Sequence, residues 1–133
     1  MSIEGHRMND SPVAPQASPG REYLERAAAL VQRLLDDEWS AIDAAATAIA
    51  TSLAAGGTLH AFGTGHSHML AEELFYRAGG LVRVRPILFE GLMLHGSAPL
   101  STALERLPGL AAALVADHGV DRGDVVIVVS NSG

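Results

Sequence analysis

The sequence predicts an α/β fold, in which a doubly wound parallel sheet is covered by helices on both faces. Apolar segments at 58–62, 81–88 and 125–129 have the length of strands, and helical patterns separate them along the chain. The last segment, VVIVV, is an unbroken aliphatic run, which is typical of a parallel strand buried on both faces. Alternation of such strands with helices is the pattern of a parallel α/β sheet.

The third strand is the last element that the pattern predicts. A parallel strand normally leads into a crossover helix, and none follows before Gly133. We therefore expect residues 19–133 to be the N-terminal part of a longer domain whose C-terminal part is missing. One face of the 125–129 strand would then be exposed, which would make the chain marginally stable or prone to aggregate.

Composition bounds the class of protein. The 133 residues suffice for one domain, and 48% of them are hydrophobic. The formal charge of −6 argues against nucleic acid or an anionic membrane as a partner. Neither lysine nor cysteine occurs, which excludes a lysine phosphate loop, Schiff-base catalysis, disulfides and thiolate chemistry. No signal peptide or membrane span is indicated, so we expect a soluble cytoplasmic protein.

The N-terminal part predicts an arm followed by helix. Residues 1–18 contain Pro, Ser, Asn and Asp without periodicity, so we expect a disordered arm. Ser18-Pro19 then has the form of an N-cap followed by a proline at the first helical position. Apolar residues recur at threes and fours between Tyr23 and Leu53, which predicts one long helix or a helix pair with a break near 36–38. This stripe, which includes Trp39, is predicted to be core or a dimer surface.

Two further helices follow the first strand candidate. Residues 67–78 predict a helix that ends at a glycine pair. Thr102 and Glu105 have the spacing of a capping box, so a short helix is expected to begin there, and 110–118 predicts another that Gly119 closes. Within 81–88, Pro86 favours a strand end or a position at the edge of the sheet.

Two of the strand ends carry loops that suit an anionic ligand, because ligands of open parallel sheets bind beyond the carboxyl ends of the strands. GTGHS follows the first strand, and SNSG follows the third. Glycine allows close approach of the backbone, hydroxyls donate hydrogen bonds, and a helix N-terminus adds free N–H groups and partial positive charge. One such loop alone would favour a simple glycine turn with Ser67 as a helix cap, whereas two favour a phosphate site. The predicted phosphate-binding residues are Gly63, Thr64, Gly65, His66, Ser67, Ser130, Asn131 and Ser132.

A dinucleotide site is the nearest rival for the first loop. The G-x-G-x-x-G fingerprint requires a third glycine, and His68 stands in its place. The acid expected about 20 residues further on is also missing, and the closest is Glu90. The sequence therefore disfavours a nucleotide cofactor, and we expect no cofactor at all.

The segments AGGTLHAFGTGHSHMLAEELFYRAGG and VVIVVSNSG together resemble the sugar isomerase (SIS) domain family, over Tyr23 to the end of the chain. Known members include heptose-phosphate isomerase, N-acetylmuramate-6-phosphate etherase and the isomerase half of glucosamine-6-phosphate synthase. The resemblance implies a flavodoxin-like sheet of five parallel strands, a phosphosugar ligand held by the Ser/Thr loops, and homodimers or tetramers with sites near subunit interfaces. The resemblance implies a further threonine that would close the second motif after Gly133.

Acids near the first loop are candidates for catalysis. Aldose–ketose isomerisation needs a base beside the sugar, an acid for ring opening and donors for the developing oxyanion. Similar isomerases carry a catalytic glutamate in an AEEL segment, which by that match is Glu73, although this sequence has about one helical turn fewer before the acids. Glu73 could equally form an i,i+4 ion pair with Arg77. Glu90 resembles an acid that follows the second strand in the aminosugar isomerase, or it is an ordinary loop acid.

Histidines of the loop supply further candidates. His66 and His68 flank Ser67, and histidine can donate to a phosphate or move a proton during ring opening; His68 is assigned to catalysis. His68 and Glu72 are spaced as a metal-binding pair, but zinc usually takes three or four ligands. Similar heptose isomerases have a metal-binding histidine where this chain has Met69. We therefore predict no metal.

These observations lead to one expected function and two alternatives. The expected function is that of an isomerase that acts on a sugar or aminosugar phosphate. The first alternative is a sensor that binds the same ligand and passes its presence to a partner. The second is an etherase-like lyase, which would need two acids, Glu73 and Glu90.

Overall fold

The computed structural model describes residues 18–131 of the chain. They divide into two compact units, with the boundary between Ala41 and Ile42. The arm predicted for 1–18 lies outside the described residues except for Ser18, and Ser132 lies outside them as well.

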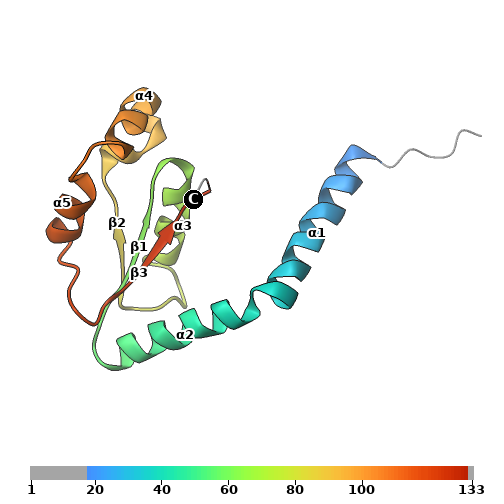
Figure 1. Cartoon of the computed structure of the whole chain (residues 1–133), viewed down its shortest axis with the longest axis horizontal. Coiled ribbons are helices and arrows are strands. Elements are labelled where there is room, and N and C mark those ends of the chain that lie inside the picture. Colours follow the sequence, from blue (N-terminus) through green and yellow to red (C-terminus); the bar gives the residue numbers. More distant parts are fainter. Residues whose placement is uncertain (1–17, 132–133) are drawn as a thin grey trace, which may run out of the picture. The chain divides into compact units, whose positions relative to one another are not determined.

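The first unit is helical. Helix α1 runs over Pro19–Asp37, and α2 runs over Trp39–Ala54 and continues into the second unit (Figure 1). The predicted break is confirmed at Glu38, whose φ of −113° and ψ of −3° end α1, while its N–H still donates to the Leu34 carbonyl at 3.2 Å. Ser18 occupies the predicted N-cap position, but its side chain makes no capping hydrogen bond.

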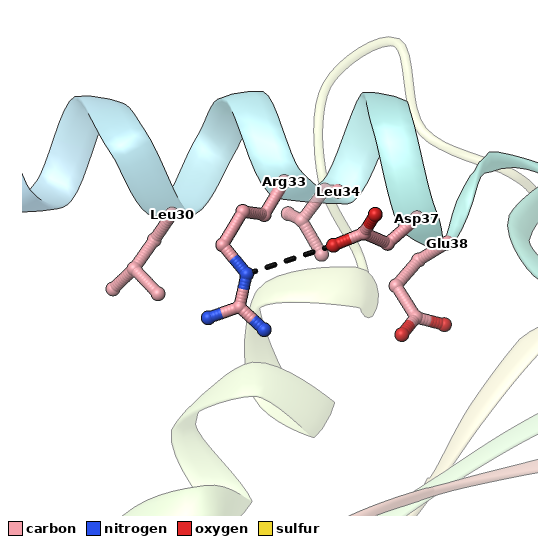
Figure 2. Close-up of a pocket in the computed structure, with 5 residues that line it drawn as sticks. All are labelled: Leu30, Arg33, Leu34, Asp37 and Glu38. Carbon is pink, nitrogen blue, oxygen red and sulfur yellow. Dashed lines mark ion pairs between the residues drawn. The ribbon is translucent and has the colours of Figure 1, made fainter.

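Within the first unit the apolar stripe on α1 is exposed, since Tyr23 and Leu24 are 71% and 67% exposed. A hollow of about 180 Å³ lies along the helix between Leu30 and Glu38, where Arg33 Nε is 3.6 Å from Asp37 Oδ2 (Figure 2). All of its lining side chains belong to α1 or to its C-cap, Glu38, so it is a shallow depression on the helix surface and not a candidate site. Within residues 18–131, no helix combines the length and the apolar character needed to cross a bilayer.

The second unit is built on the predicted parallel sheet. Strands β1 (Leu59–Gly63), β2 (Val84–Ile87) and β3 (Val125–Val129) pair in the order β2-β1-β3, with all pairs parallel. The second strand is shorter than the predicted 81–88. Pro86 lies in β2, an edge strand of these three, where its missing N–H need not serve a second neighbour.

Helices cover the two faces of the sheet. Helices α3 (His68–Leu74) and α5 (Leu110–Asp117) flank the sheet from opposite sides (Figure 1). Ala61 of β1 and Ala71 of α3 are fully buried where the helix packs on the sheet. On the α5 side, Ile87 and Leu114 belong to a hydrophobic cluster against which Phe62 packs. These layers confirm the predicted doubly wound α/β class.

Helix α3 ends four residues earlier than the predicted Ala78. Residues Gly65–Ser67 form a 3-10 turn (η1), and α3 follows it only as far as Leu74. Phe75 is extended and Tyr76 has a φ of +49°, so the chain leaves the helix there. Aromatic residues are poor helix formers, and two in succession weaken the last predicted turn.

The capping box predicted at Thr102 and Glu105 is wrong, because both residues lie at the end of α4 (Leu94–Glu105). The cap is Ser97, whose φ of −166° and ψ of 111° interrupt this helix after its first residues. Its Oγ accepts the Leu100 N–H at 3.3 Å, and Pro99 occupies the first turn after it. Ser97 and Pro99 were thus the helix-start signal in the sequence. Helix α5 ends at Asp117 before Gly119, as predicted.

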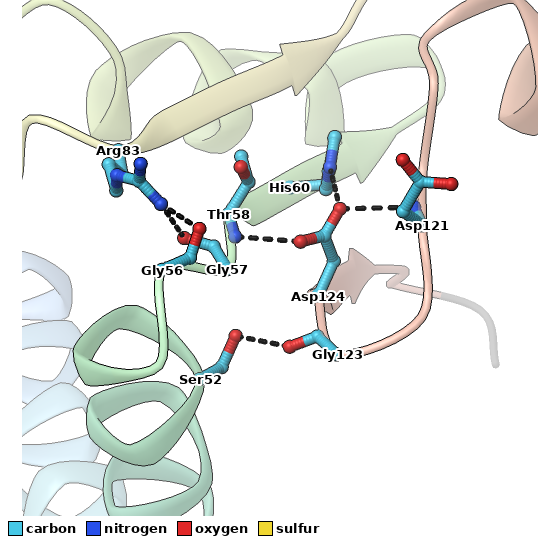
Figure 3. Close-up of polar contacts among 9 residues, drawn as sticks. All are labelled: Ser52, Gly56, Gly57, Thr58, His60, Arg83, Asp121, Gly123 and Asp124. Carbon is cyan, nitrogen blue, oxygen red and sulfur yellow. Dashed lines mark hydrogen bonds and ion pairs between the residues drawn. The ribbon is translucent and has the colours of Figure 1, made fainter.

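A polar network joins the amino ends of the strands (Figure 3). The Asp124 carboxylate accepts the backbone N–H groups of Thr58 at 2.7 Å and Asp121 at 3.1 Å, and His60 Nε2 lies 3.1 Å from it. Ser52 Oγ donates to the Gly123 carbonyl at 2.5 Å, which ties α2 to the loop before β3. The predicted packing of His60 in the core is confirmed by its exposure of 1%.

Candidate functional site

The carboxyl ends of β1 and β3 border a cavity of about 1120 Å³. In the parallel register Gly63 pairs with Val129, so Thr64 and Ser130 are the first residues beyond the two strands. Both of them line the cavity. The two loops that the sequence singled out therefore meet in one space, which is the location that ligands of open parallel sheets use.

Five of the predicted phosphate-binding residues line this cavity, and they come from both loops. They are Thr64, His66, Ser67, Ser130 and Asn131. Ser132 lies outside the described residues. Hydroxyl, amide and imidazole groups of two separate chain segments thus face one space, and such groups can surround a phosphate with hydrogen bonds.

The two glycines of the first loop shape its backbone and do not line the cavity. A Cβ on Gly63 would lie 2.6 Å from both the carbonyl carbon and the carbonyl oxygen of Ser67, so only glycine fits beneath the turn. Gly65 has a φ of +54°, a conformation that glycine adopts without strain. The Ser67 N–H donates to the Thr64 carbonyl at 2.9 Å, which leaves the Ser67 hydroxyl as that residue's donor for a ligand.

Two carboxylates line the cavity, and the sequence predicted one of them. Glu73 of α3 lines it and also forms the ion pair with Arg77 that the spacing of the two residues allowed. The second carboxylate is Glu105, the last residue of α4. Glu90 begins the short 3-10 turn η2 (Glu90–Leu92) and does not line the cavity.

His68 lies beside the cavity wall and not in its lining. Its Nδ1 donates to the Gly65 carbonyl, and its Nε2 is 3.8 Å from Glu72 Oε2. The ring therefore braces the loop around Ser67. Within residues 18–131, no group of three or more His, Asp or Glu side chains is arranged to hold a metal ion.

The electrostatics of the lining favour neutral donors. Among the described residues that line the cavity, none is an arginine, and the chain has no lysine. An anion bound here would therefore rely on hydroxyls, amides and His66. Glu105 has no hydrogen-bond or ion-pair partner among the described residues, which leaves one uncompensated carboxylate in the lining.

A smaller cavity of about 310 Å³ adjoins the first, and both are lined by Phe62, Thr64 and Glu105. Leucines make up much of its remaining wall: Leu92, Leu104, Leu107, Leu110 and Leu114. Sequence reasoning missed Glu105, because it used this residue only as a helix-start signal. No local motif marks Glu105; the folding of α4 over the strand ends brings it to the site.

Comparison with known proteins gives a consistent family. The sequence model of the SIS domain matches residues 22–133. A UPF0309 protein from Listeria innocua is 44% identical over 111 residues, which cover 84% of this chain and 45% of that protein. A UPF0309 protein from Streptomyces avermitilis is 41% identical over 128 residues, covering 95% of this chain and 49% of that protein. One from Brucella ovis is 42% identical over 111 residues, with coverages of 84% and 46%. The chain thus spans about half the length of the relatives it matches.

Proposed function

This chain belongs to the SIS domain family of phosphosugar-binding domains, and from that premise we propose that it binds a sugar phosphate. The phosphate group would lie between the GTGHS and SNSG loops, and the chain would form part of an aldose–ketose isomerase. The observation that carries the proposal is the convergence of Thr64, Ser67 and Ser130 on one cavity. A phosphate needs several donors directed at one point, and two neighbouring strand ends supply them.

The phosphate would fix the sugar so that its C1–C2 bond lies near an acid. In isomerisation a base removes the proton from C2, and a cis-enediol forms as a proton moves onto the carbonyl oxygen at C1. The proton then returns at C1 while the hydroxyl at C2 becomes the new carbonyl, so atoms and charge balance. Glu73 is the base in this proposal, because its carboxylate lines the cavity one turn into the helix that follows the phosphate loop.

One observation also favours the lyase alternative. Elimination needs an acid and a base on the same substrate, and two carboxylates, Glu73 and Glu105, line the cavity. The earlier pairing of Glu73 with Glu90 receives no such support, because Glu90 is outside the lining. We further propose, from the family resemblance, that the protein acts as a homodimer or tetramer.

Binding and chemistry are tested separately. Isothermal titration with inorganic phosphate and with glucose 6-phosphate measures the affinity of the wild type, Thr64→Val and Ser67→Ala. Each variant removes one hydroxyl donor, so we expect the affinity for both ligands to fall about tenfold, the equivalent of about 1.4 kcal/mol. Thr102→Val is the matched control, because Thr102 is exposed on α4 and lines neither cavity. Unchanged affinity in both hydroxyl variants would contradict the phosphate site.

Proton exchange in deuterated water, followed by NMR at C2 of glucose 6-phosphate and at C1 of fructose 6-phosphate, tests the isomerase. We expect exchange in the wild type and its loss in Glu73→Gln, with phosphate affinity retained. Binding without exchange would favour the sensor, and formation of an unsaturated sugar would favour the lyase.

A further inference from the structure

We propose that Glu105 binds hydroxyl groups of the sugar, and so selects sugar phosphates over phosphate itself. This inference rests on the proposed function, because it places the sugar next to the phosphate position. It adds a substrate-binding residue from α4, an element that carries neither of the phosphate loops.

The position of Glu105 carries the first step. The larger cavity is lined by the phosphate-loop residues, and the smaller one is lined in part by residues of α4 and α5. Both are lined by Thr64 and Glu105, so these two side chains stand where the cavities join. A ligand whose phosphate is held at Thr64 has its next atoms close to this junction.

The chemistry of the smaller cavity carries the second step. Among the described residues that line it, Thr64 and Glu105 are the two with polar side chains, and most of the others are leucines. A polyhydroxylated ligand that enters it would find one strong acceptor there, because an ionised carboxylate accepts hydrogen bonds and donates none. The leucine wall suits the apolar C–H face of a sugar.

The charge balance carries the third step. Glu73 is compensated by Arg77, whereas Glu105 has no ion-pair partner among the described residues. An uncompensated carboxylate repels a phosphate dianion and attracts hydroxyl donors. Glu105 is exposed, so water and salt screen this repulsion in part. The carboxylate nevertheless favours a ligand that brings hydroxyl donors to it over bare phosphate.

These two effects give Glu105→Gln opposite consequences for two ligands. Removal of the negative charge leaves the affinity for inorganic phosphate unchanged or raises it. Loss of the charged acceptor lowers the affinity for glucose 6-phosphate about tenfold. The matched control is Asp117→Asn, because Asp117 is also the last residue of an α-helix, is 82% exposed and lines neither cavity.

Isothermal titration of both ligands against the 133-residue chain tests the inference, and circular dichroism confirms that each variant is folded. The inference is supported if the dissociation constant of phosphate, divided by that of glucose 6-phosphate, falls in Glu105→Gln and stays unchanged in Asp117→Asn. Equal effects on both ligands, no effect on either, or a wild type that does not prefer the sugar phosphate would overturn it while the phosphate site stands. Failure of the wild type to bind inorganic phosphate would instead defeat the proposed function.

Discussion

Gly63 lies directly beneath Ser67, so that a Cβ on Gly63 would come within 2.6 Å of the Ser67 carbonyl group. Gly63 is also the last residue of β1 and pairs with Val129 of β3. Gly63 therefore belongs to the paired end of the sheet and at the same time contacts the backbone of the GTGHS loop. Ser67, whose backbone lies against Gly63, lines the cavity.

Gly63→Ala is expected to displace the loop. Backbone atoms cannot yield as a flexible side chain can, so the variant should lose about 1–3 kcal/mol of unfolding free energy and bind phosphate more weakly. Urea denaturation and titration calorimetry measure the two effects. Gly96→Ala is the control, because a Cβ there meets nothing within 4 Å and its φ is not positive. Equal stability of the two variants would refute the role of Gly63.

Ser101→Ala is expected to destabilise the packing of α4. Ser101 is 1% exposed, and its Oγ donates to the Leu92 carbonyl at 3.0 Å, which fixes the helix to the turn that precedes it. Loss of this donor leaves a buried carbonyl unsatisfied and costs about 1–3 kcal/mol. The neighbouring Thr102 is exposed, so the unfolding free energy of Thr102→Ala should stay within about 0.5 kcal/mol of the wild type. If the two variants unfold at the same denaturant midpoint, the Ser101 hydrogen bond does not stabilise the packing of α4.

Asp124 should make stability depend on acid pH. The backbone N–H groups of Asp121 and Thr58, together with His60, hold the pKa of its carboxyl below the ordinary value of 3.8. The unfolded chain therefore binds this proton more readily, so the contribution of Asp124 is complete above the ordinary pKa and is lost as pH falls through the lowered value. We expect Asp124→Asn to flatten the acid limb of stability against pH, measured by urea unfolding between pH 2 and 6 (roughly the range in which carboxyls titrate). If the unfolding free energy of the variant falls as steeply with acid pH as that of the wild type, other carboxyl groups cause the fall.

The ion pair between Glu73 and Arg77 should contribute little to stability. Its side chains are 63% and 59% exposed, and exposed pairs are worth about 0–1 kcal/mol. We expect Arg77→Gln and Glu73→Gln to unfold within about 0.5 kcal/mol of the wild type in urea. Such a result would leave Glu73 available for chemistry. A loss of well over 1 kcal/mol in either variant would identify the pair as structural.

Most of the architecture could be predicted because local patterns report it directly. The VVIVV run became β3 over the predicted residues, and acids near Asp37 coincide with the break between α1 and α2. The phosphate-loop residues came together because parallel strands end at the same edge of a sheet. Periodicity and strand direction were sufficient for these features.

Features set by tertiary contact could not be predicted in the same way. The spacing of Thr102 and Glu105 suits a helix start, but Ser97 caps the helix earlier, and Glu105 instead reaches the cavity from the helix end. Gly63 was predicted to let the backbone approach a phosphate, and its tight fit beneath Ser67 is visible only in the folded loop. The roles of Glu105 and Gly63 depend on which segments of the chain pack together, and local sequence patterns do not report such contacts.

The convergence of two loops on one phosphate is tested most directly by NMR titration of the 133-residue chain with inorganic phosphate and glucose 6-phosphate. We predict that the largest backbone amide shifts fall within 64–67 and 130–131, with saturation at the same ligand concentration for both groups. Saturable binding that shifts neither group, or only one of them, would contradict the account.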